Sequence, residues 1–466
     1  MTHDTTESPR ADGSGGTEPP GAAQSLRADE TDFSSTDETD SSPTDETDPP
    51  SRTTRRGLLR IGGTGLALGG AVGSAGCLSA LPPLGGGQRY GRIDAPASDD
   101  PEYARWVPAP WDEVSEDDYF GFGAARPGTA PRVPHLLAWR RASTVCSLDY
   151  FGVGWASYDR YVWTPAGSVL TGSFEAKTVR DTLGGTAYRP AGDYREYDLF
   201  ERPDGRRVAV RDGTLLFVTP DDEHPDLERL ADTGAGAHPR LVDANDAAAT
   251  VVERASESTR VSAAREFGAF HEAAAWGADG FRVGDDGVYQ VITLVFPSPD
   301  TITLDELQTA YRERTGLVEA WTQEADSFDA QMDERVATLE TRVPEGDLRR
   351  FDAVAEPVQA TWGFEWDAAE RALTIRHEAG ASADPNRLTV DIDTDEAPYR
   401  HDDRPVWTDV DRVEPGAETT LDLGAVTGLE SVGLDLRRVG EDGWSYWNLA
   451  GWRAPTVDGG EGGDHS

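Results

Sequence analysis

The stretch YREYDLFERPDGRRVAVRDGTLLFV, residues 194–218, decides the fold. Apolar and polar residues alternate in three short runs, and the pairs Asp204-Gly205 and Asp212-Gly213 separate these runs. A period of two is typical of a strand with one buried face, and Asp-Gly between two such runs favours a tight hairpin turn. We therefore predict an antiparallel meander of three strands at 194–201, 206–211 and 214–218.

The residues around the meander, 101–260, add further strands and helices. Strands are predicted at 153–163 and 168–174, and helices at 175–183, 224–232 and 244–256. An antiparallel sheet with helices on one face accounts for this order of elements. Residues 101–260 are therefore predicted to form an α+β domain.

Residues 261–345 repeat this mixture of predicted strands and helices. A helix is predicted at 262–276, and strands at 281–283, 288–296 and 336–343. Thr303 and Glu306 form a capping-box pattern that predicts the start of a helix reaching to about residue 314. We expect a second α+β half, which either shares one sheet with the first half or packs against it as a pseudo-dimer.

In residues 356–456 the sequence predicts strands only. Short alternating runs separated by turn residues predict a β-sandwich with strands at 360–366, 372–377, 387–392, 419–423 and 431–439. The predicted fold class is therefore α+β, with two halves of antiparallel sheet plus helix, followed by this sandwich.

Four segments of this last region resemble the β-module of archaeal type IV pilins and other haloarchaeal surface proteins. They are 364–367 (FEWD), 373–380 (LTIRHEAG), 388–390 (LTV) and 413–416 (VEPG). The resemblance implies an immunoglobulin-like surface domain, and it does not imply that the chain is a pilin.

The N-terminal region has the order of an export signal. Residues 1–50 are predicted to be a disordered acidic tail. In 51–77, a twin-arginine pattern is followed by a mildly apolar stretch and by the lipobox-like GSAGC at 73–77, and 78–100 is predicted to be a flexible linker. The residues of the pattern are Arg55, Arg56, Leu58 and Leu59, and the lipid would be attached to Cys77. Residues 457–466 are predicted to be a second disordered tail.

This combination resembles an archaeal Tat lipoprotein signal. The resemblance implies two partners, the Tat translocase during export and the membrane through a lipid on Cys77. The expected location is the extracellular face of the cell membrane, and an uncleaved membrane anchor is the alternative. The region 101–345 also broadly resembles haloarchaeal lipoproteins, a similarity that implies no activity.

The charge indicates a salt-rich environment. The chain has 85 acidic and 43 basic residues, a formal net charge of −42, and Lys177 is its only lysine. Molar salt shortens the Debye length to about 3 Å and screens the resulting self-repulsion. The composition resembles that of proteins from extremely halophilic archaea; an acidic protein that binds cations or basic partners is the alternative. We exclude nucleic acid as a partner because its phosphates would be repelled.

The sequence contains no motif that identifies a catalytic, metal or cofactor site, so no cofactor is expected. Asp391, Asp393 and Asp395 are candidate metal ligands, but the spacing around them departs from a calcium loop at two places. With Cys77 lipidated, Cys146 would have no partner, and a buried structural thiol is expected there.

Tryptophan gives the remaining signal for binding. Trp106, Trp111, Trp155 and Trp163 are candidates for an aromatic groove, although packing of the core is the preferred explanation for them. The sequence therefore favours a non-enzymatic, lipid-anchored surface protein of a halophilic archaeon with an envelope, scaffold or binding role. A receptor for a solute, sugar or peptide is the first alternative, and a hydrolase with an unrecognised site is the second.

Overall fold

The computed structural model of the chain describes residues 89, 90, 93, 95, 96, 99–111, 114, 120–128, 132, 133, 135–265, 273–313, 325–350, 357–394, 400–402, 406–440 and 443–455. These residues belong to a compact unit, Gly86–Ser466. The predicted tails at 1–50 and 457–466 and the predicted signal at 51–77 lie outside the described residues. Part of the predicted linker, β1, is a strand of the sheet described next.

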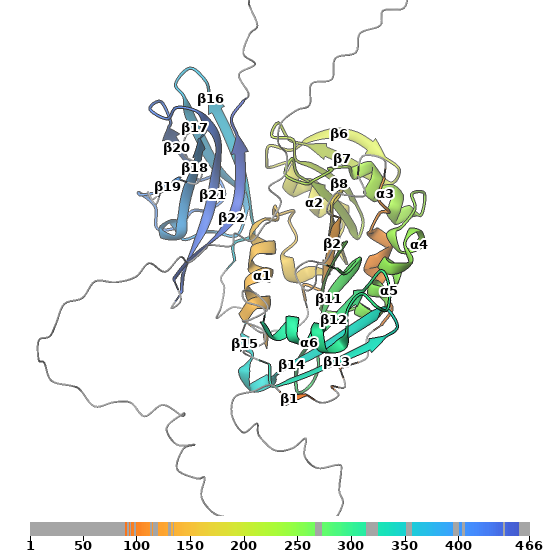
Figure 1. Ribbon diagram of the computed structural model, residues 1–466. Helices are drawn as coiled ribbons and strands as arrows, with labels where there is room; N and C mark the ends of the chain where they lie inside the picture. The colour runs from red at the N-terminus through yellow and green to blue at the C-terminus, as the bar shows by residue number, and fades with distance from the viewer. Residues whose placement is uncertain are drawn as a thin grey trace, which may run out of the picture. The chain divides into compact units, whose positions relative to one another are not determined.

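One large sheet dominates the α+β part of the molecule (Figure 1). It has 13 strands in the order β1-β13-β14-β12-β11-β10-β2-β4-β5-β9-β8-β7-β6, and its neighbouring strands are antiparallel except for β1 and β13. The strands are β1 Arg89–Tyr90, β2 Gly121–Ala125, β4 Tyr158–Thr164, β5 Gly167–Gly172, β6 Arg189–Tyr194, β7 Tyr197–Glu201, β8 Arg207–Arg211, β9 Thr214–Val218, β10 Arg260–Arg265, β11 Trp276–Val283, β12 Gly287–Val295, β13 Ser327–Asp333 and β14 Val336–Pro344.

The predicted meander is confirmed as β7, β8 and β9. Gly205 (φ 89°) and Gly213 (φ 69°) occupy its two turns in the left-handed region, which glycine adopts at low cost. The sequence did not predict β6, which pairs with β7 and forms the end of the sheet.

The helix predicted at 262–276 is wrong at its described residues, 262–265 and 273–276. β10 begins at Arg260 and pairs on one side with β2 and on the other with β11. Val261 and Ala263 are buried, whereas Ser262 is partly exposed, as a strand requires. The helix propensity of this alanine-rich stretch is overridden because it lies between two strands that both need a partner. Through β10, the two predicted halves share one continuous sheet.

Helices cover both faces of this sheet, and not one face as expected. Neighbouring residues of β5 and β9 enter different cores: Val169 and Leu216 pack in one, and Leu170 and Leu215 in the other. The helices are α1 His135–Cys146, α2 Ala176–Leu183, α3 Leu227–Ala235, α4 Leu241–Ala244, α5 Asp246–Ala255 and α6 Leu304–Glu313.

We call the side covered by α3, α4 and α5 the first face, and the side with α1, α2 and α6 the second face (Figure 1). Short 3₁₀ turns occur at Glu102–Trp106, Trp155–Ser157, Glu345–Asp347 and Pro385–Arg387. A small separate sheet pairs β3 Arg132–Val133 with β15 Arg349–Arg350. In the described part of the chain, no helix combines the length and the apolar character that crossing a bilayer requires.

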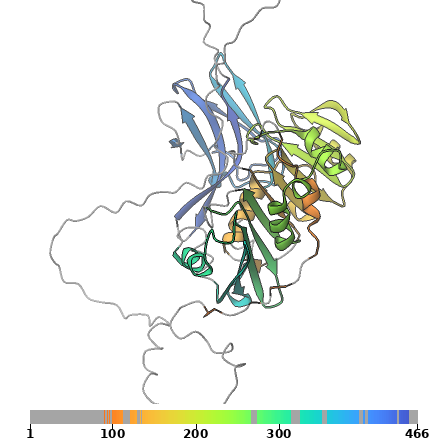
Figure 2. The ribbon, with the colours of Figure 1, turned by 45° about the vertical axis from the view of Figure 1, so that its right-hand side comes forward.

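The C-terminal strands form two sheets around one core, which we call the C-terminal sheet pair (blue in Figure 2). One sheet contains β16 Ala360–Asp367, β17 Ala372–Gly380 and β20 Glu418–Asp422; the other contains β19 Arg400–Asp402, β18 Leu388–Thr394, β21 Leu429–Gly440 and β22 Gly443–Arg453. The five predicted strands are present, and β19 and β22 were not predicted. In the shared core, Trp362 stacks on His377 with 4.6 Å between ring centroids.

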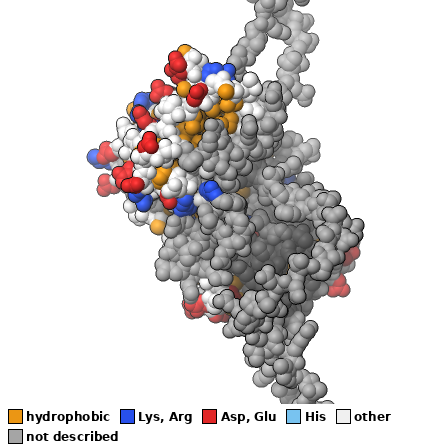
Figure 3. Space-filling view, turned by 90° about the vertical axis from the view of Figure 1, so that its left-hand side faces the viewer, with side chains coloured by type: hydrophobic (Ala, Val, Ile, Leu, Met, Phe, Trp, Pro, Cys, Tyr) orange, Lys and Arg blue, Asp and Glu red, His pale blue; other side chains and the backbone are white. Residues whose placement is uncertain are grey.

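Mixed charges and an apolar group of side chains share the outer surface of this part of the molecule (Figure 3). Trp366 on β16 and Trp452 on β22 form a half-buried aromatic pair with 5.2 Å between ring centroids. These edge strands belong to different sheets, so the pair helps to close the space between them.

Candidate functional site

The middle of the second face contains a polar, partly exposed region, which we call the central patch. The strand register places Ser262 of β10 beside Gly123 of β2 and Gly123 beside Trp163 of β4. The adjacent row places Arg260 beside Ala125 and Ala125 beside Tyr161. Three small residues therefore separate an aromatic side of the patch from a charged side.

Exposure distinguishes the central patch from its surroundings. Towards either end of the second face, four side chains beneath the helices are at most 2% exposed: Leu170, Leu215, Ile292 and Leu339. The residues of the patch, by contrast, are partly exposed: Arg260, Ser262, Tyr161, Trp163 and Ala125. Side chains in the middle of a sheet of this width are normally covered, so the patch is a place where solvent reaches the sheet.

On the charged side, Asp279 of β11 is the carboxylate that lies near Arg140 of α1. Its Oδ1 accepts a hydrogen bond of 3.1 Å from Gln290 Nε2, and its Oδ2 lies 3.8 Å from Arg140 Nη1 of α1. Gln290 in turn accepts from the Thr341 hydroxyl at 3.4 Å. Burial raises the pKa of Asp279 despite the opposing effect of Arg140.

The side chain of Arg260, unlike that of Asp279, has no hydrogen-bond partner among the described residues. Within the described part of the chain, no residue forms a hydrogen bond or an ion pair with its guanidinium, and its Nε atom is buried. Burial and the like charge of Arg140 lower its pKa to about 10. The patch therefore has two guanidinium groups and one carboxylate, which is paired with Arg140 alone, and this gives it a local positive charge in a chain of net charge −42.

Rings line the opposite side of the patch. The Trp163 indole lies over Gly123, where an added Cβ would be 2.4 Å from Nε1. The Tyr161 hydroxyl is 3.2 Å from the Ser168 hydroxyl, and the Trp155 ring lies 5.4 Å from the Tyr161 ring. Burial is the main reason why the pKa of Tyr161 rises to about 12.

The four candidate tryptophans do not form one groove. Trp155 and Trp163 lie on the second face, as described. Trp106 is 1% exposed in the core of the first face, where a Cβ added to Gly234 would meet its ring. Trp111 packs against the same core and lies 4.2 Å beneath the Arg229 guanidinium.

Arg140, Arg260 and Asp279 of the patch were not predicted from the sequence. Asp279 carried a usable signal, because an acid between small and apolar residues, as in the segment Trp276–Phe281 of β11, is unusual for a buried strand. Arg260 and Arg140 carried no such signal, because arginine is common throughout this sequence.

The other candidate residues do not form a site in the described part of the chain. Asp391 and Asp393 lie on β18, whereas Asp395 lies outside the described residues, as do Cys77, Arg55, Arg56, Leu58 and Leu59. Among the residues that the structure describes, no three His, Cys, Asp or Glu side chains gather as a metal site would require.

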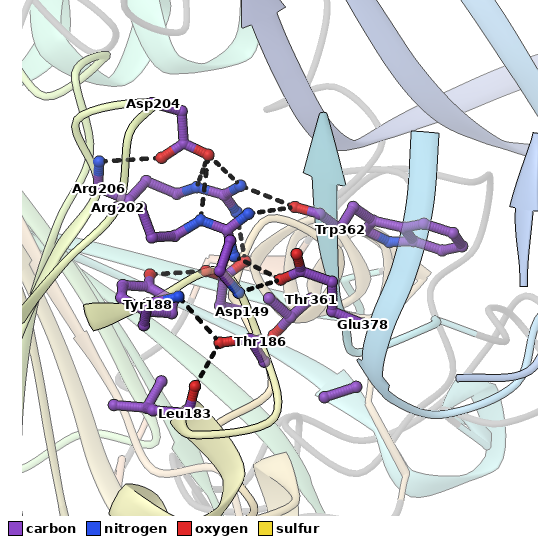
Figure 4. A network of polar contacts seen from close by, with 12 residues as sticks. Asp149, Leu183, Thr186, Tyr188, Arg202, Asp204, Arg206, Thr361, Trp362 and Glu378 are labelled. Atoms are coloured by element: carbon purple, nitrogen blue, oxygen red, sulfur yellow. Dashed lines mark hydrogen bonds and ion pairs between the residues drawn. The ribbon is translucent and has the colours of Figure 1, made fainter. Parts of the chain in front are cut away.

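A second cluster, the buried ion network, joins the large sheet to the C-terminal sheet pair (Figure 4). Arg202 and Arg206, on either side of the β7–β8 turn, both donate to the main-chain oxygen of Trp362, at 3.1 and 2.8 Å. Arg202 also donates to Glu378 at 2.8 Å, and Arg206 to Asp149 at 2.7 Å. The four charged side chains of these contacts are at least nine-tenths buried.

Further contacts complete the buried ion network. Asp204 bridges the two guanidinium groups, and the Tyr188 hydroxyl donates to Asp149 at 2.8 Å. Burial alone would raise the pKa of Asp204, but hydrogen bonding to Arg206 and the charge of both arginines lower it. Every charged member has an opposite charge beside it, which indicates a structural joint rather than a reactive centre.

Cys146 is buried and unpaired with sulfur, which confirms the prediction of a structural thiol. It lies at the end of α1 and packs in the core of the C-terminal sheet pair. Burial raises the pKa of the thiol to about 12, so it is a poor nucleophile at neutral pH.

No protein-family model matches the chain, and no curated protein matches it. The solved structure titled "Structure of crystal form I of TP0453" is similar to 55% of this chain over 97% of its own length, at 7% sequence identity and a TM-score of 0.33.

Proposed function

We propose that the protein is a lipid-anchored binding protein on the surface of a halophilic archaeon. The order of Arg55, Arg56 and Cys77 supports export and lipid attachment, and the net charge of −42 supports a salt-rich environment. In this proposal, the membrane and the Tat translocase are partners of the N-terminal segment, and the large sheet provides the binding surface.

The observation that carries the binding role is the central patch. A protein that serves only as a scaffold has no need for partly exposed rings opposite a guanidinium without a partner, in the middle of an otherwise buried sheet face. Ligand sites combine apolar walls with a few polar groups that orient the ligand, and the patch has this composition.

A ligand screen tests this role. We expect compounds of one class among sugars, amino acids, short peptides and organic acids to raise the melting temperature of the full chain in molar KCl, because a ligand that binds only the folded state stabilises it. Trp163→Leu should abolish that shift, while the matched control Trp111→Leu, on the first face, should retain it. A screen without a shift, or equal loss in both variants, would reject a binding role for the patch.

The anchor has a separate test. Cys77→Ser should release the protein from the membrane fraction into the medium, and mass spectrometry of the mature wild-type chain should show a lipid on its N-terminal cysteine. Cys146→Ser is the matched control and should stay with the membrane. An unmodified Cys77 in the mature protein would reject lipid anchoring.

An envelope or scaffold role is the second candidate. The buried ion network favours it, because it couples the large sheet to the C-terminal sheet pair through side chains of both. We propose that this sheet pair is an immunoglobulin-like sandwich, as its resemblance to surface modules implies. Such a domain would present the large sheet at a fixed orientation.

A further inference from the structure

We propose that the central patch binds a small organic carboxylate, with the carboxylate held by Arg260 and Arg140 and a planar or apolar body held against Trp163 and Tyr161. This inference rests on the proposed binding role and names the chemical class of the ligand. Nothing else in the described part of the chain combines an unpaired guanidinium, a floor of small residues and partly exposed rings.

The charged end of the ligand follows from Arg260. A guanidinium presents several N–H donors in one plane and matches a carboxylate in two parallel hydrogen bonds. The Nε atom of Arg260 is buried and has no hydrogen-bond acceptor among the described residues. A buried or half-buried charge without a partner is costly, so an anion at this position would supply the missing interaction.

The charge balance favours an anion over a cation or a neutral group. Arg140 and Arg260 together carry two positive charges, and Asp279 supplies one negative charge that Gln290 and Arg140 already engage. The repulsion between the two arginines contributes to the lowered pKa of Arg260. A bound carboxylate would relieve this repulsion, and a cation would increase it.

The body of the ligand follows from the floor and the rings. Tyr161 lies two strands from Arg260, about 10 Å away at the usual strand spacing. Ala125 lies between them, and in the adjacent row the Trp163 indole covers Gly123 and so forms a wall beside this interval. A ring-sized ligand body there would contact the faces or edges of Trp163 and Tyr161.

Salt limits the form that binding takes. In molar salt, the long-range field of the chain is screened within about 3 Å, so its net negative charge does not exclude an anion. Only contacts at hydrogen-bond distance and apolar contacts remain effective. We therefore expect recognition to depend on both ends of the ligand rather than on charge alone.

The test uses isothermal titration of the full chain in molar KCl with four probes. Benzoate combines a carboxylate with a ring, benzamide has the ring without the charge, acetate has the charge without the ring, and inorganic phosphate is a different oxyanion. Saturable binding of benzoate, at least tenfold tighter than that of each other probe, is expected. Equal affinity for benzamide, or tighter binding of phosphate, would overturn the proposal.

Variants locate the site. Arg260→Gln should weaken benzoate binding at least tenfold, about 1.4 kcal/mol. Arg207→Gln is the matched control, because Arg207 pairs with Glu228 on the other face and should leave binding unchanged. If Arg260→Gln does not fold, two other variants test the site. Arg140→Gln removes a positive charge from α1, and Ser262→Leu fills the floor of the patch while both arginines remain. Benzoate binding unaffected by both would overturn the proposal.

Failure of this inference differs from failure of the proposed function. If benzoate does not bind but another compound class gives a Trp163-dependent shift in melting temperature, the carboxylate assignment is wrong and the binding role stands. If no class gives such a shift, both are wrong.

Discussion

Gly123 provides the space that the Trp163 indole occupies. A Cβ at this position would lie 2.4 Å from Trp163 Nε1 and 2.8 Å from the main-chain oxygen of Val261, and the second atom belongs to a paired strand that cannot move freely. Gly123→Ala should therefore lower the free energy of unfolding by about 1–3 kcal/mol, measured by urea titration. Gly154→Ala is the control, because nothing lies within 4 Å of a Cβ there. Equal effects would show that the indole does not need this glycine.

Asp204 should make stability depend on pH with a defined sign. Its pKa is lower in the folded protein than the unfolded value of about 3.9, so its contribution is present above that value and is lost as the pH falls through the folded pKa. The difference in unfolding free energy between the wild type and Asp204→Asn should thus be constant near neutral pH and shrink below about pH 4. Urea titration at several pH values measures it. A difference that grows on acidification would contradict the assignment.

The first turn of α6 shows what a local sequence pattern can determine. Thr303 accepts a hydrogen bond from the Glu306 amide at 3.2 Å, and the Glu306 carboxylate accepts one from the Thr303 amide at 2.8 Å, which confirms the predicted capping box. Thr303→Ala should destabilise the helix by about 1 kcal/mol, visible as faster amide hydrogen exchange in α6. Thr309→Ala, within the same helix, should leave exchange nearly unchanged. Similar exchange in both variants would contradict the role of the cap.

The elements that could be predicted are those with local signals. The meander has two Asp-Gly turns, α6 has a capping box, and the α+β class follows from the order of such elements. β10 could not be predicted, because its alanine-rich sequence favours a helix and only its neighbours β2 and β11 make it a strand. The central patch was missed for the same reason: Arg260 and Tyr161 are 99 positions apart in the chain, and only the strand register brings them together.

At the scale of the whole molecule, the buried ion network joins two bodies with separate cores. Arg206→Met removes a donor to Asp149, Asp204 and the Trp362 carbonyl and leaves Asp149 as a buried charge. We expect a loss of about 3–5 kcal/mol in the free energy of unfolding. Arg376→Met breaks an exposed pair with Glu418 and should cost at most about 1 kcal/mol. Equal losses would show that the network does not couple the two bodies.

The buried thiol of Cys146 can report how often this joint opens. Cys146 belongs to α1 by sequence and to the core of the C-terminal sheet pair by packing, and with Cys77 lipidated it is the one thiol left in the chain. A thiol reagent reaches Cys146 only when α1 and the C-terminal sheet pair separate. The rate at which the thiol is modified therefore measures the rate of that opening. Because it is buried, the sulfur is also protected from oxidants in the solvent for as long as the joint stays closed.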